Sequence, residues 1–209
     1  MVKPKYKKRD PQRKKELIKW RTDQILNAAM KVFARCGFEG TDVEDIAALA
    51  GVGKGTIYRY FKSKGDLFFS VLEWGMDTLH KRVVGAIGNT KGSMEKLKAA
   101  LSTYLGFFEE NRDFYRVLIL EKVEHKPREH ERMKKKHLSG VRFFENILKE
   151  GVREGVFRKI KVDSVAYALW GTSNALLLKW LLSEKKYPLK EEISVMEEIY
   201  CSGILKNRK

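Results

Sequence analysis

The sequence predicts an all-α protein with an N-terminal three-helix helix-turn-helix domain and a larger C-terminal helical domain. Three observations support this prediction. Every long segment places its apolar residues at helical spacing, and none alternates apolar and polar residues as a half-buried strand would. Capping residues and glycines separate these segments. Around residues 41–61, a turn with two glycines joins two short predicted helices, which is a helix-turn-helix signature.

The charge of the 209-residue chain is strongly positive, with a formal net charge of +16 at pH 7. That balance indicates a polyanionic partner, which is either nucleic acid or an anionic membrane surface. The hydrophobic share of 43% is ordinary for a packed domain. The sequence shows neither a membrane-spanning run nor a secretory signal, and its two cysteines, Cys36 and Cys201, are expected to be buried thiols. We therefore expect a cytoplasmic protein without a membrane partner.

The segment from Thr41 to Phe61 carries the clearest motif. Asp42 is a good N-cap for a short helix, in which Ile46, Ala47 and Ala50 recur at helical spacing. Two alanines on this apolar face allow a second helix to pack closely. The glycines at positions 51 and 53 can take the positive φ needed to end one helix and begin another at a steep angle.

The second short helix, Lys54 to Phe61, is expected to turn Ile57 and Phe61 inward and to expose cationic, hydroxyl and phenol groups. Such a face suits the major groove, because these groups contact phosphates and base edges. A capping box of Ser63 and Asp66 then begins another helix, whose free N–H groups form a phosphate site. The alternative is an ordinary surface helix. The predicted DNA contacts are Thr41, Lys54, Gly55, Thr56, Tyr58, Arg59, Tyr60 and Lys64.

A set of short pieces with fixed spacing surrounds and includes this motif. The pieces are Ile25-Leu26-Asn27-Ala28-Ala29 with Phe33 and Gly37-Phe38, then Asp45-Ile46-Ala47, Ala50-Gly51-Val52, Gly55-Thr56-Ile57-Tyr58-Arg59-Tyr60-Phe61, and Ser63-Lys64 with Leu67. Through these pieces, residues 21–74 resemble the DNA-binding domain of TetR-family transcriptional regulators. Two positions depart from the family pattern: Asp42 stands where threonine is frequent, and Glu44 where a basic residue is frequent. Because carboxylates repel phosphate, the DNA contacts carried over are chiefly residues 54–60 and Lys64.

The N-terminal region divides into a basic arm, residues 1–19, and a DNA-binding domain, residues 20–66. Two interpretations of the arm stay open. It is either a flexible tail that raises affinity for any polyanion or a segment that follows a DNA groove beside the recognition helix. A helix from about Gln12 or Trp20 to Cys36, ended by Gly37, is expected to complete the three-helix domain.

Residues 67–209 are expected to form the effector-binding and dimerisation domain. The helix that follows Asp163 is apolar on nearly all sides, and the last helix carries an apolar stripe. These patterns favour a two-fold dimer to which the two helices of each protomer contribute a four-helix interface. The alternative is that both helices belong to the internal core. The dimer candidates are Leu169, Leu176, Leu177, Trp180, Met196, Ile199 and Tyr200. The predicted helices run from Ser63 to about Val84, Ser93 or Met94 to Glu110, Phe114 to Glu124 after an Asp113 cap, Pro127 to about Glu154, onward from an Asp163 cap, and Leu189 to about Lys206.

Aromatic residues are abundant in this second part of the chain. At helical spacing most should belong to the core, yet a helical domain with many aromatic walls can also enclose an apolar ligand. The resemblance implies such an effector pocket and a homodimer, and it favours a repressor that a small, largely apolar effector releases from a double-stranded DNA operator. The candidate pocket residues are Trp74, Tyr104, Phe107, Phe108, Phe114, Phe143, Phe144 and Trp170.

Catalytic and metal-site patterns are absent from the sequence. His125 and His130 are five residues apart, off a common helical face, and His137 lies among lysines, so a solvated basic surface is the better interpretation. We recognise no nucleophile elbow, Walker loop, dinucleotide fingerprint or HExxH motif, and expect no enzyme activity, cofactor or metal. The rival is a basic helical protein that binds polyanions or membrane surfaces without reading sequence.

Overall fold

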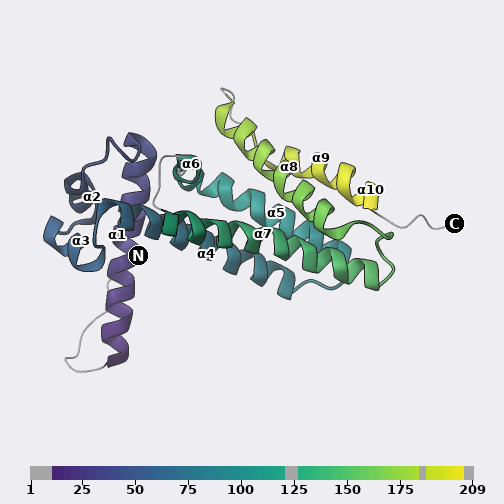
Figure 1. The fold of residues 1–209 in the computed structure, drawn as a ribbon, viewed down its shortest axis with the longest axis horizontal. Coiled ribbons are helices and arrows are strands. Elements are labelled where there is room, and N and C mark those ends of the chain that lie inside the picture. The colour runs from purple at the N-terminus through teal and green to yellow at the C-terminus, as the bar shows by residue number, and fades with distance from the viewer. Residues whose placement is uncertain (1–10, 121–126, 184–186, 205–209) are drawn as a thin grey trace.

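The computed structural model describes residues 11–120, 127–183 and 187–204, and every regular element in these ranges is a helix (Figure 1). The predicted all-α class is confirmed. The helices are α1 (Pro11–Cys36), α2 (Val43–Ala50), α3 (Lys54–Tyr60), α4 (Lys64–Gly88), α5 (Ser93–Glu110), α6 (Arg112–Leu120), α7 (Pro127–Arg153), α8 (Val162–Leu182) and α9 (Lys190–Met196), followed by the π-helical turn η1 (Glu197–Cys201) and α10 (Ser202–Ile204).

Helix α1 begins earlier than the predicted DNA-binding domain. Residues 11–19, which the sequence assigned to the basic arm, are its first turns, so this half of the arm is helical. Pro11 is the first residue of the helix, a position where a missing N–H costs nothing. Residues 1–10 lie outside the described ranges. The helix ends as predicted at Gly37, whose φ is 71°.

The turn between α2 and α3 uses one glycine in the way the sequence indicated and the other differently. Gly51 has φ 63° and ends α2, with its N–H donating to the carbonyl of Ala48 at 3.1 Å. Gly53 instead has φ −77° and is the extended residue before α3. One left-handed residue is therefore enough to redirect the chain between the two helices.

A compact apolar core holds α1 to α4 together. Ile25, Phe33, Ile46, Ile57 and Leu67, which come from all four helices, are essentially inaccessible to solvent. Phe33 also meets Phe68 edge to face, with ring centroids 5.0 Å apart. This core fixes the orientation of α3 relative to the rest of the domain.

Helix α4 links the two parts of the molecule. Its first turn forms half of the predicted capping box, because the Asp66 N–H donates to Ser63 Oγ at 3.1 Å. The Asp66 carboxylate accepts from the N–H of the preceding Lys62 at 2.9 Å. Further along, α4 packs against α1, α5, α6 and α7. It extends to Gly88, a few residues beyond the prediction. One helix thus begins beside α3 and ends inside the C-terminal domain (Figure 1).

The C-terminal helices pack α5 on α4 and α7 on α8, with α9 against α5. Two predicted caps were wrong. Helix α6 begins at Arg112, directly after α5, so Asp113 lies in its first turn, and α8 follows Lys161, so Asp163 also lies inside its helix. The expected helical residues 121–124, 205 and 206 lie outside the described ranges. Among the residues described, no helix is long and apolar enough to cross a membrane.

Candidate nucleic-acid interface and effector domain

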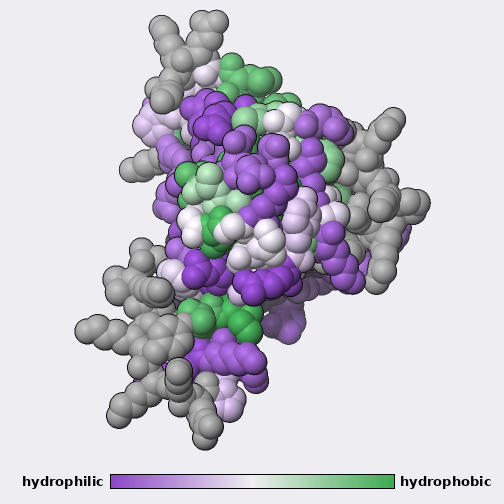
Figure 2. Space-filling model, turned by 90° about the vertical axis from the view of Figure 1, so that its left-hand side faces the viewer, coloured by the Kyte–Doolittle hydropathy of each residue, from purple (hydrophilic) through white to green (hydrophobic). Residues whose placement is uncertain are grey.

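Helix α3 divides its side chains as the sequence predicted. Ile57 and the following Phe61 are buried, whereas Gly55, Tyr58 and Arg59 are exposed, with Tyr58 at 46%. Thr56 lies beside this exposed face, where its Oγ1 accepts a hydrogen bond from Arg59 at 3.3 Å. Figure 2 views this end of the molecule and shows mostly hydrophilic residues over its described surface. The face therefore offers donors and acceptors rather than an apolar patch.

Two predicted contacts lie less openly than the sequence indicated. Tyr60 is partly buried against the core and its ring lies 6.4 Å from that of Phe61, so it stands at the edge of the face. Thr41 is buried, and its hydroxyl donates to the carbonyl of Gly37 at 2.6 Å. The Thr41 hydroxyl therefore holds the loop before α2 in place and is not presented to a ligand.

Lys64, the predicted phosphate contact, is also engaged within the chain. Its Nζ donates to the carbonyl oxygens of Glu39 at 3.2 Å and Thr41 at 3.1 Å, and it lies 4.8 Å from the centre of the Phe38 ring. An ammonium group has three N–H donors, so at most one stays available for DNA. Lys64 fastens the start of α4 to the loop before α2.

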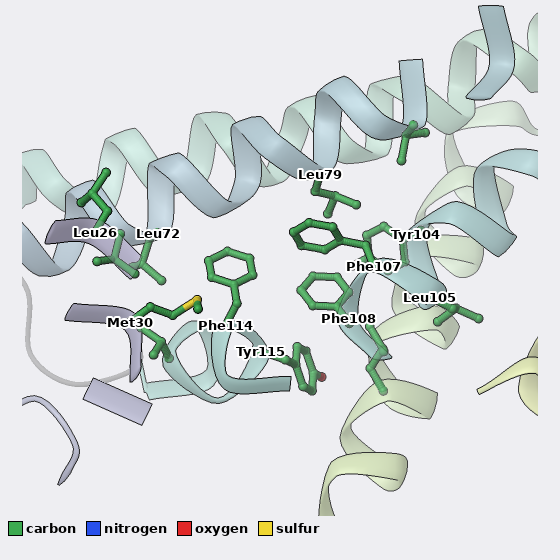
Figure 3. Packing of buried hydrophobic residues seen from close by; sticks show 14 of the residues in the cluster. Leu26, Met30, Leu72, Leu79, Tyr104, Leu105, Phe107, Phe108, Phe114 and Tyr115 are labelled. Carbon is green, nitrogen blue, oxygen red and sulfur yellow. The ribbon is translucent and has the colours of Figure 1, made fainter. Parts of the chain in front are cut away.

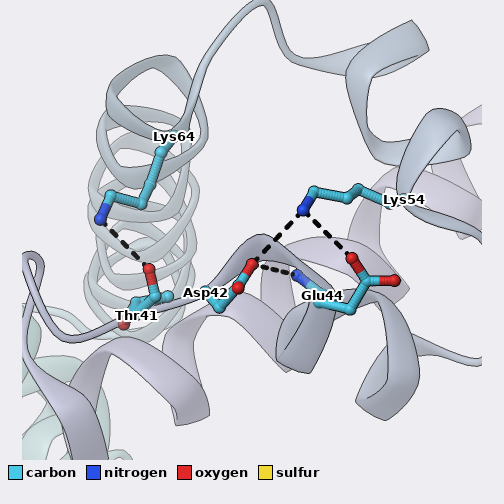
Figure 4. A network of polar contacts seen from close by, with 5 residues as sticks. All are labelled: Thr41, Asp42, Glu44, Lys54 and Lys64. Atoms are coloured by element: carbon cyan, nitrogen blue, oxygen red, sulfur yellow. Dashed lines mark hydrogen bonds and ion pairs between the residues drawn. The ribbon is translucent and has the colours of Figure 1, made fainter.

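Lys54 forms ion pairs with two carboxylates at the start of α2 (Figure 4). Its Nζ lies 3.1 Å from Glu44 Oε2 and 3.6 Å from Asp42 Oδ1. Asp42 is at the same time the N-cap of α2, accepting from the Glu44 N–H at 2.9 Å. That backbone hydrogen bond, with the Lys54 charge next, lowers the pKa of Asp42, and the contact with Glu44 chiefly raises the pKa of Lys54. Asp42 and Lys54 are therefore both charged at neutral pH.

The aromatic residues predicted to wall a pocket largely pack on one another (Figure 3). Phe108 and Phe114 stack in parallel with centroids 6.0 Å apart, and Phe107 meets both edge to face. Tyr104 meets Phe108 and Phe144 in the same way. These rings are buried, so in this structure they fill the space that a ligand would need.

Two phenol groups bring polarity into this cluster. Tyr104 donates to Asn174 Oδ1 at 3.4 Å, and Tyr115, a residue absent from the predicted set, donates to the Asn174 carbonyl at 3.1 Å. Burial raises the pKa of Tyr115 to about 12 and raises that of Tyr104 as well. Both groups are neutral donors at physiological pH.

Phe114 is the closest link between the aromatic cluster and α4. A Cβ added to Gly75 would lie only 2.1 Å from Cε2 of Phe114, so the ring rests directly on the α4 backbone. Leu72 of α4 and Leu26 and Met30 of α1 lie on the side of this ring that faces away from Phe107 and Phe108 (Figure 3). Because α6 also packs along α1, the aromatic cluster adjoins the helices that carry α3.

The remaining pocket candidates occupy other places. Trp74 donates from its indole N–H to Asp23 of α1 at 3.1 Å, which makes it part of the α1–α4 contact. Phe143 and Trp170 are partly buried at the α7–α8 side. A surface cavity of about 420 Å³ lies elsewhere, between the ends of α5 and α8 and the start of α6. It is lined by Glu109, Arg112, Trp180, Tyr187 and Pro188.

Two charged side chains line this cavity, Glu109 and Arg112, and the sequence singled out neither. The Arg112 guanidinium lies 4.8 Å from the centre of the Trp180 ring and donates to the Leu181 carbonyl at 3.0 Å. Its Nε is buried and has no hydrogen-bond partner. An isolated arginine in a helical sequence carries no signal of such a position, because the surrounding residues come from three separate segments.

The dimer candidates divide by exposure. Leu169, Leu177 and Met196 are fully buried within one protomer and Trp180 nearly so, which places them in the core of the protomer. Leu176 and Tyr200 are partly buried, and Ile199 is 58% exposed. Four further exposed apolar side chains lie on these helices, and the sequence does not indicate them because a helix that is apolar on nearly all sides does not reveal its outward face. They are Tyr167, Leu178, Leu182 and Val195.

No group of three or more His, Cys, Asp or Glu side chains in the described ranges is placed to hold a metal ion. His80 lies on α4, while the side chains of His125, His130 and His137 are outside the residues described. Cys36 is partly buried and unpaired.

Two family profiles match the chain. That of the bacterial regulatory proteins of the tetR family matches residues 25–71, and that of the tetracyclin repressor-like C-terminal domain matches residues 90–181. Together they cover more than half of the chain. The stretch between the two matches, residues 72–89, covers most of α4, the helix that links the two parts of the fold.

Several relatives are named as regulators of fatty acid metabolism. The fatty acid metabolism regulator protein of Bacillus subtilis is 27% identical over 182 residues, which are 87% of this chain and 94% of that protein. The structure of FadR from Bacillus subtilis in complex with stearoyl-CoA is 27% identical, with a TM-score of 0.79 over 87% of this chain and 98% of that one. FadR of Bacillus halodurans has the same TM-score and coverage at 23% identity, which shows the fold alone.

Proposed function

The chain belongs to the TetR family of transcriptional regulators, and from that premise we propose that it is a homodimeric, cytoplasmic repressor of a double-stranded DNA operator. In this proposal α3 enters the major groove and reads base edges through Thr56, Tyr58 and Arg59. Lys64 contributes one phosphate contact while it holds the loop before α2. The observation that carries the proposal is the exposed polar face of α3, held by a buried Ile57 between two capped helices.

We propose that the effector is a long-chain acyl-CoA thioester. The support is the Bacillus subtilis relative whose structure contains stearoyl-CoA, together with the buried aromatic cluster of the C-terminal domain. An acyl chain of that length would have to displace rings that now contact one another, and Phe114 would lose its seat on Gly75. The Arg112 guanidinium, on the same helix as Phe114, would meet the phosphates of the head group.

The signal would reach DNA through α4. In a dimer the two α3 helices must lie about 34–36 Å apart to enter successive major grooves on one face of the duplex. Movement of Phe114 against Gly75 would tilt α4, whose capped first turn adjoins α3. The coupling is reciprocal, so acyl-CoA weakens operator binding by the same factor by which the operator weakens acyl-CoA binding.

The dimer is proposed to form through the outward faces of α8, α9 and η1. Tyr167, Leu178, Leu182, Val195 and Ile199 are exposed apolar residues on these elements. Such a surface is typical of a site of association. A two-fold axis through it would join four helices, two from each protomer.

The test begins with selection of genomic DNA fragments on the purified protein, followed by titration of the enriched site with stearoyl-CoA. We expect fragments that share a sequence, and a loss of operator affinity by a factor of about 5–150 on adding stearoyl-CoA. Tyr58→Ala should cost about 1–3 kcal/mol on the enriched site and little on random DNA of equal length. Coenzyme A alone and stearate alone serve as ligand controls.

Each outcome addresses a different part of the proposal. Retained fragments without a shared sequence would favour the rival, a general polyanion-binding protein, over a regulator. Stearoyl-CoA that binds without changing operator affinity would contradict the effector switch. Arg112→Gln should weaken stearoyl-CoA binding more than stearate binding, and equal losses would remove Arg112 from the head-group site.

A further inference from the structure

The start of α2 places two carboxylates on the proposed DNA-binding side of the protein. Asp42 and Glu44, here called the acid pair, are 65% and 69% exposed. Both approach the ammonium of Lys54, the first residue of α3, which is itself 42% exposed (Figure 4). Among these three groups two negative charges face one positive charge, and the Lys64 ammonium acts on Asp42 without forming an ion pair with it. The first turn of the proposed recognition helix is therefore unfavourable for a phosphate.

An exposed ion pair of this kind is easily exchanged. Such pairs contribute about 0–1 kcal/mol, since water and salt screen them. Lys54 is therefore held by the acid pair in the free protein but can leave it. Moving Lys54 from a carboxylate to a DNA phosphate exchanges one anionic partner for another. A contact between Lys54 and phosphate in sequence-independent binding therefore adds little to the free energy of binding.

The high positive charge of the whole chain explains why the ion pairs that hold Lys54 would matter for specificity. The net charge of +16 attracts any stretch of DNA, because each phosphate that a cation neutralises releases counterions. Sequence-independent sites far outnumber operators in a genome, so a regulator depends on the ratio of its specific to its non-specific affinity. A lysine that makes no phosphate contact at sequence-independent sites lowers the non-specific affinity and so raises that ratio.

We propose that the acid pair is a specificity determinant that keeps Lys54 from contributing to sequence-independent DNA binding. On random DNA, Lys54 stays paired with Asp42 and Glu44. On the operator, insertion of α3 into the groove brings Lys54 against the DNA, and the ion pairs open. This inference rests on the proposed DNA-binding role of α3 and adds to it the groups that limit binding at the wrong sites.

The test is the double variant Asp42→Asn/Glu44→Gln. Asparagine caps a helix about as well as aspartate, so α2 should keep its first turn. We expect random-DNA affinity to rise several-fold, operator affinity to rise less, and the salt slope on random DNA to steepen by about 0.9, the value for one phosphate contact. Glu44→Gln alone removes the closer partner without touching the cap, and should give part of the same change.

A matched control separates this effect from net charge. Glu110→Gln/Glu145→Gln also removes two carboxylates that pair with exposed cations, Arg82 and Lys149, but in the C-terminal domain. It should change random-DNA affinity less than the acid-pair variant does. Equal increases in the two double variants would overturn the proposal, because the effect would then be one of total charge.

Lys54→Gln completes the cycle. In the acid-pair variant it should abolish the gain in random-DNA affinity, whereas in the wild-type background, where Lys54 makes no phosphate contact on random DNA, the loss should be smaller. An equal loss in both backgrounds would show that the acid pair does not restrain Lys54. These random-DNA measurements need no operator, so they decide this inference even if fragment selection fails to support the proposed regulator.

Discussion

The N-terminal domain and the C-terminal domain differ in the sequence range of the contacts that set their local geometry. In the N-terminal domain the helix ends are set by neighbours in sequence: Asp42 accepts from the Glu44 N–H, and Ser63 from the Asp66 N–H. In the C-terminal domain, a ring from one helix rests on the backbone of another, as Phe114 of α6 does on Gly75 of α4. Short-range caps set the ends of the helices beside the proposed binding face, whereas the proposed effector would have to rearrange long-range ring contacts.

The largest expected effect tests where the C-terminal domain keeps its core. Leu177→Glu places a carboxylate in a fully buried position of α8, which costs several kcal/mol because the charge has no partner. We expect loss of the fold by circular dichroism. The same change at the exposed Ile199 should leave a folded chain and weaken the proposed dimer, as measured by sedimentation.

Two results would change this picture of α8 and η1. A folded Leu177→Glu variant would mean that α8 does not face the core as described. A folded Ile199→Glu variant that stays a dimer at every concentration tested would place the interface elsewhere.

The next effect concerns the contact between the Phe114 ring and the α4 backbone at Gly75. In Gly75→Ala the new methyl group must push the ring away, and overpacking of this kind costs about 1–3 kcal/mol. Gly106→Ala is the matched control, because nothing lies within 4 Å of its added Cβ on α5. It should stabilise the protein by about 0.5–1 kcal/mol through helix propensity. Thermal unfolding measures both, and changes of the same sign would show that Phe114 gives way freely.

Local signals predicted much of the N-terminal domain. The caps at Asp42 and Ser63, the left-handed Gly51 and the inward turn of Ile57 all depend on residues within one or two helical turns, so the sequence contains them. The contacts of Thr41 and Lys64 could not be predicted in this way. Both depend on how the loop after Gly37 folds back against the start of α4, and that path is set by tertiary packing.

In the C-terminal domain the sequence predicted which residues are apolar but not what each one faces. Leu177 and Leu178 are adjacent on α8, yet one is buried and the other 41% exposed. The aromatic residues were expected to line a pocket, and most of them pack on one another. Whether rings meet each other or a ligand depends on helix spacing, which no residue pattern encodes.

A smaller effect is expected from a local cap in the N-terminal domain. Ser63→Ala removes the oxygen that accepts the Asp66 N–H and should lower stability by about 1 kcal/mol. Ser63→Asn can replace that acceptor and should recover most of the loss. Chemical denaturation gives both values. Equal losses for the two variants would indicate that the α4 start is stabilised by something other than this hydrogen bond.

The last effect is absent at neutral pH, appears only in alkaline solution and involves the two buried phenols of the C-terminal domain. Burial raises the pKa of Tyr115 to about 12 and raises that of Tyr104 too. A tyrosine in the unfolded chain ionises near pH 10, at about its model value. Above that pH, the unfolded state releases protons that the folded state retains. The stabilisation from the neutral phenols is therefore complete below about pH 10 and is lost as the pH rises towards 12.

Urea midpoints measured from about pH 9 to pH 11.5 should fall less steeply in Tyr115→Phe than in the wild type, because phenylalanine has no proton to lose. Tyr115→Phe also lacks the hydrogen bond to the Asn174 carbonyl, so the slope with pH rather than the absolute midpoint is compared. Tyr58→Phe, which alters the exposed face of α3, should keep the wild-type slope. Equal slopes for all three proteins would mean that ionisation of Tyr115 does not cause the alkaline loss of stability, and that this loss begins outside the aromatic cluster.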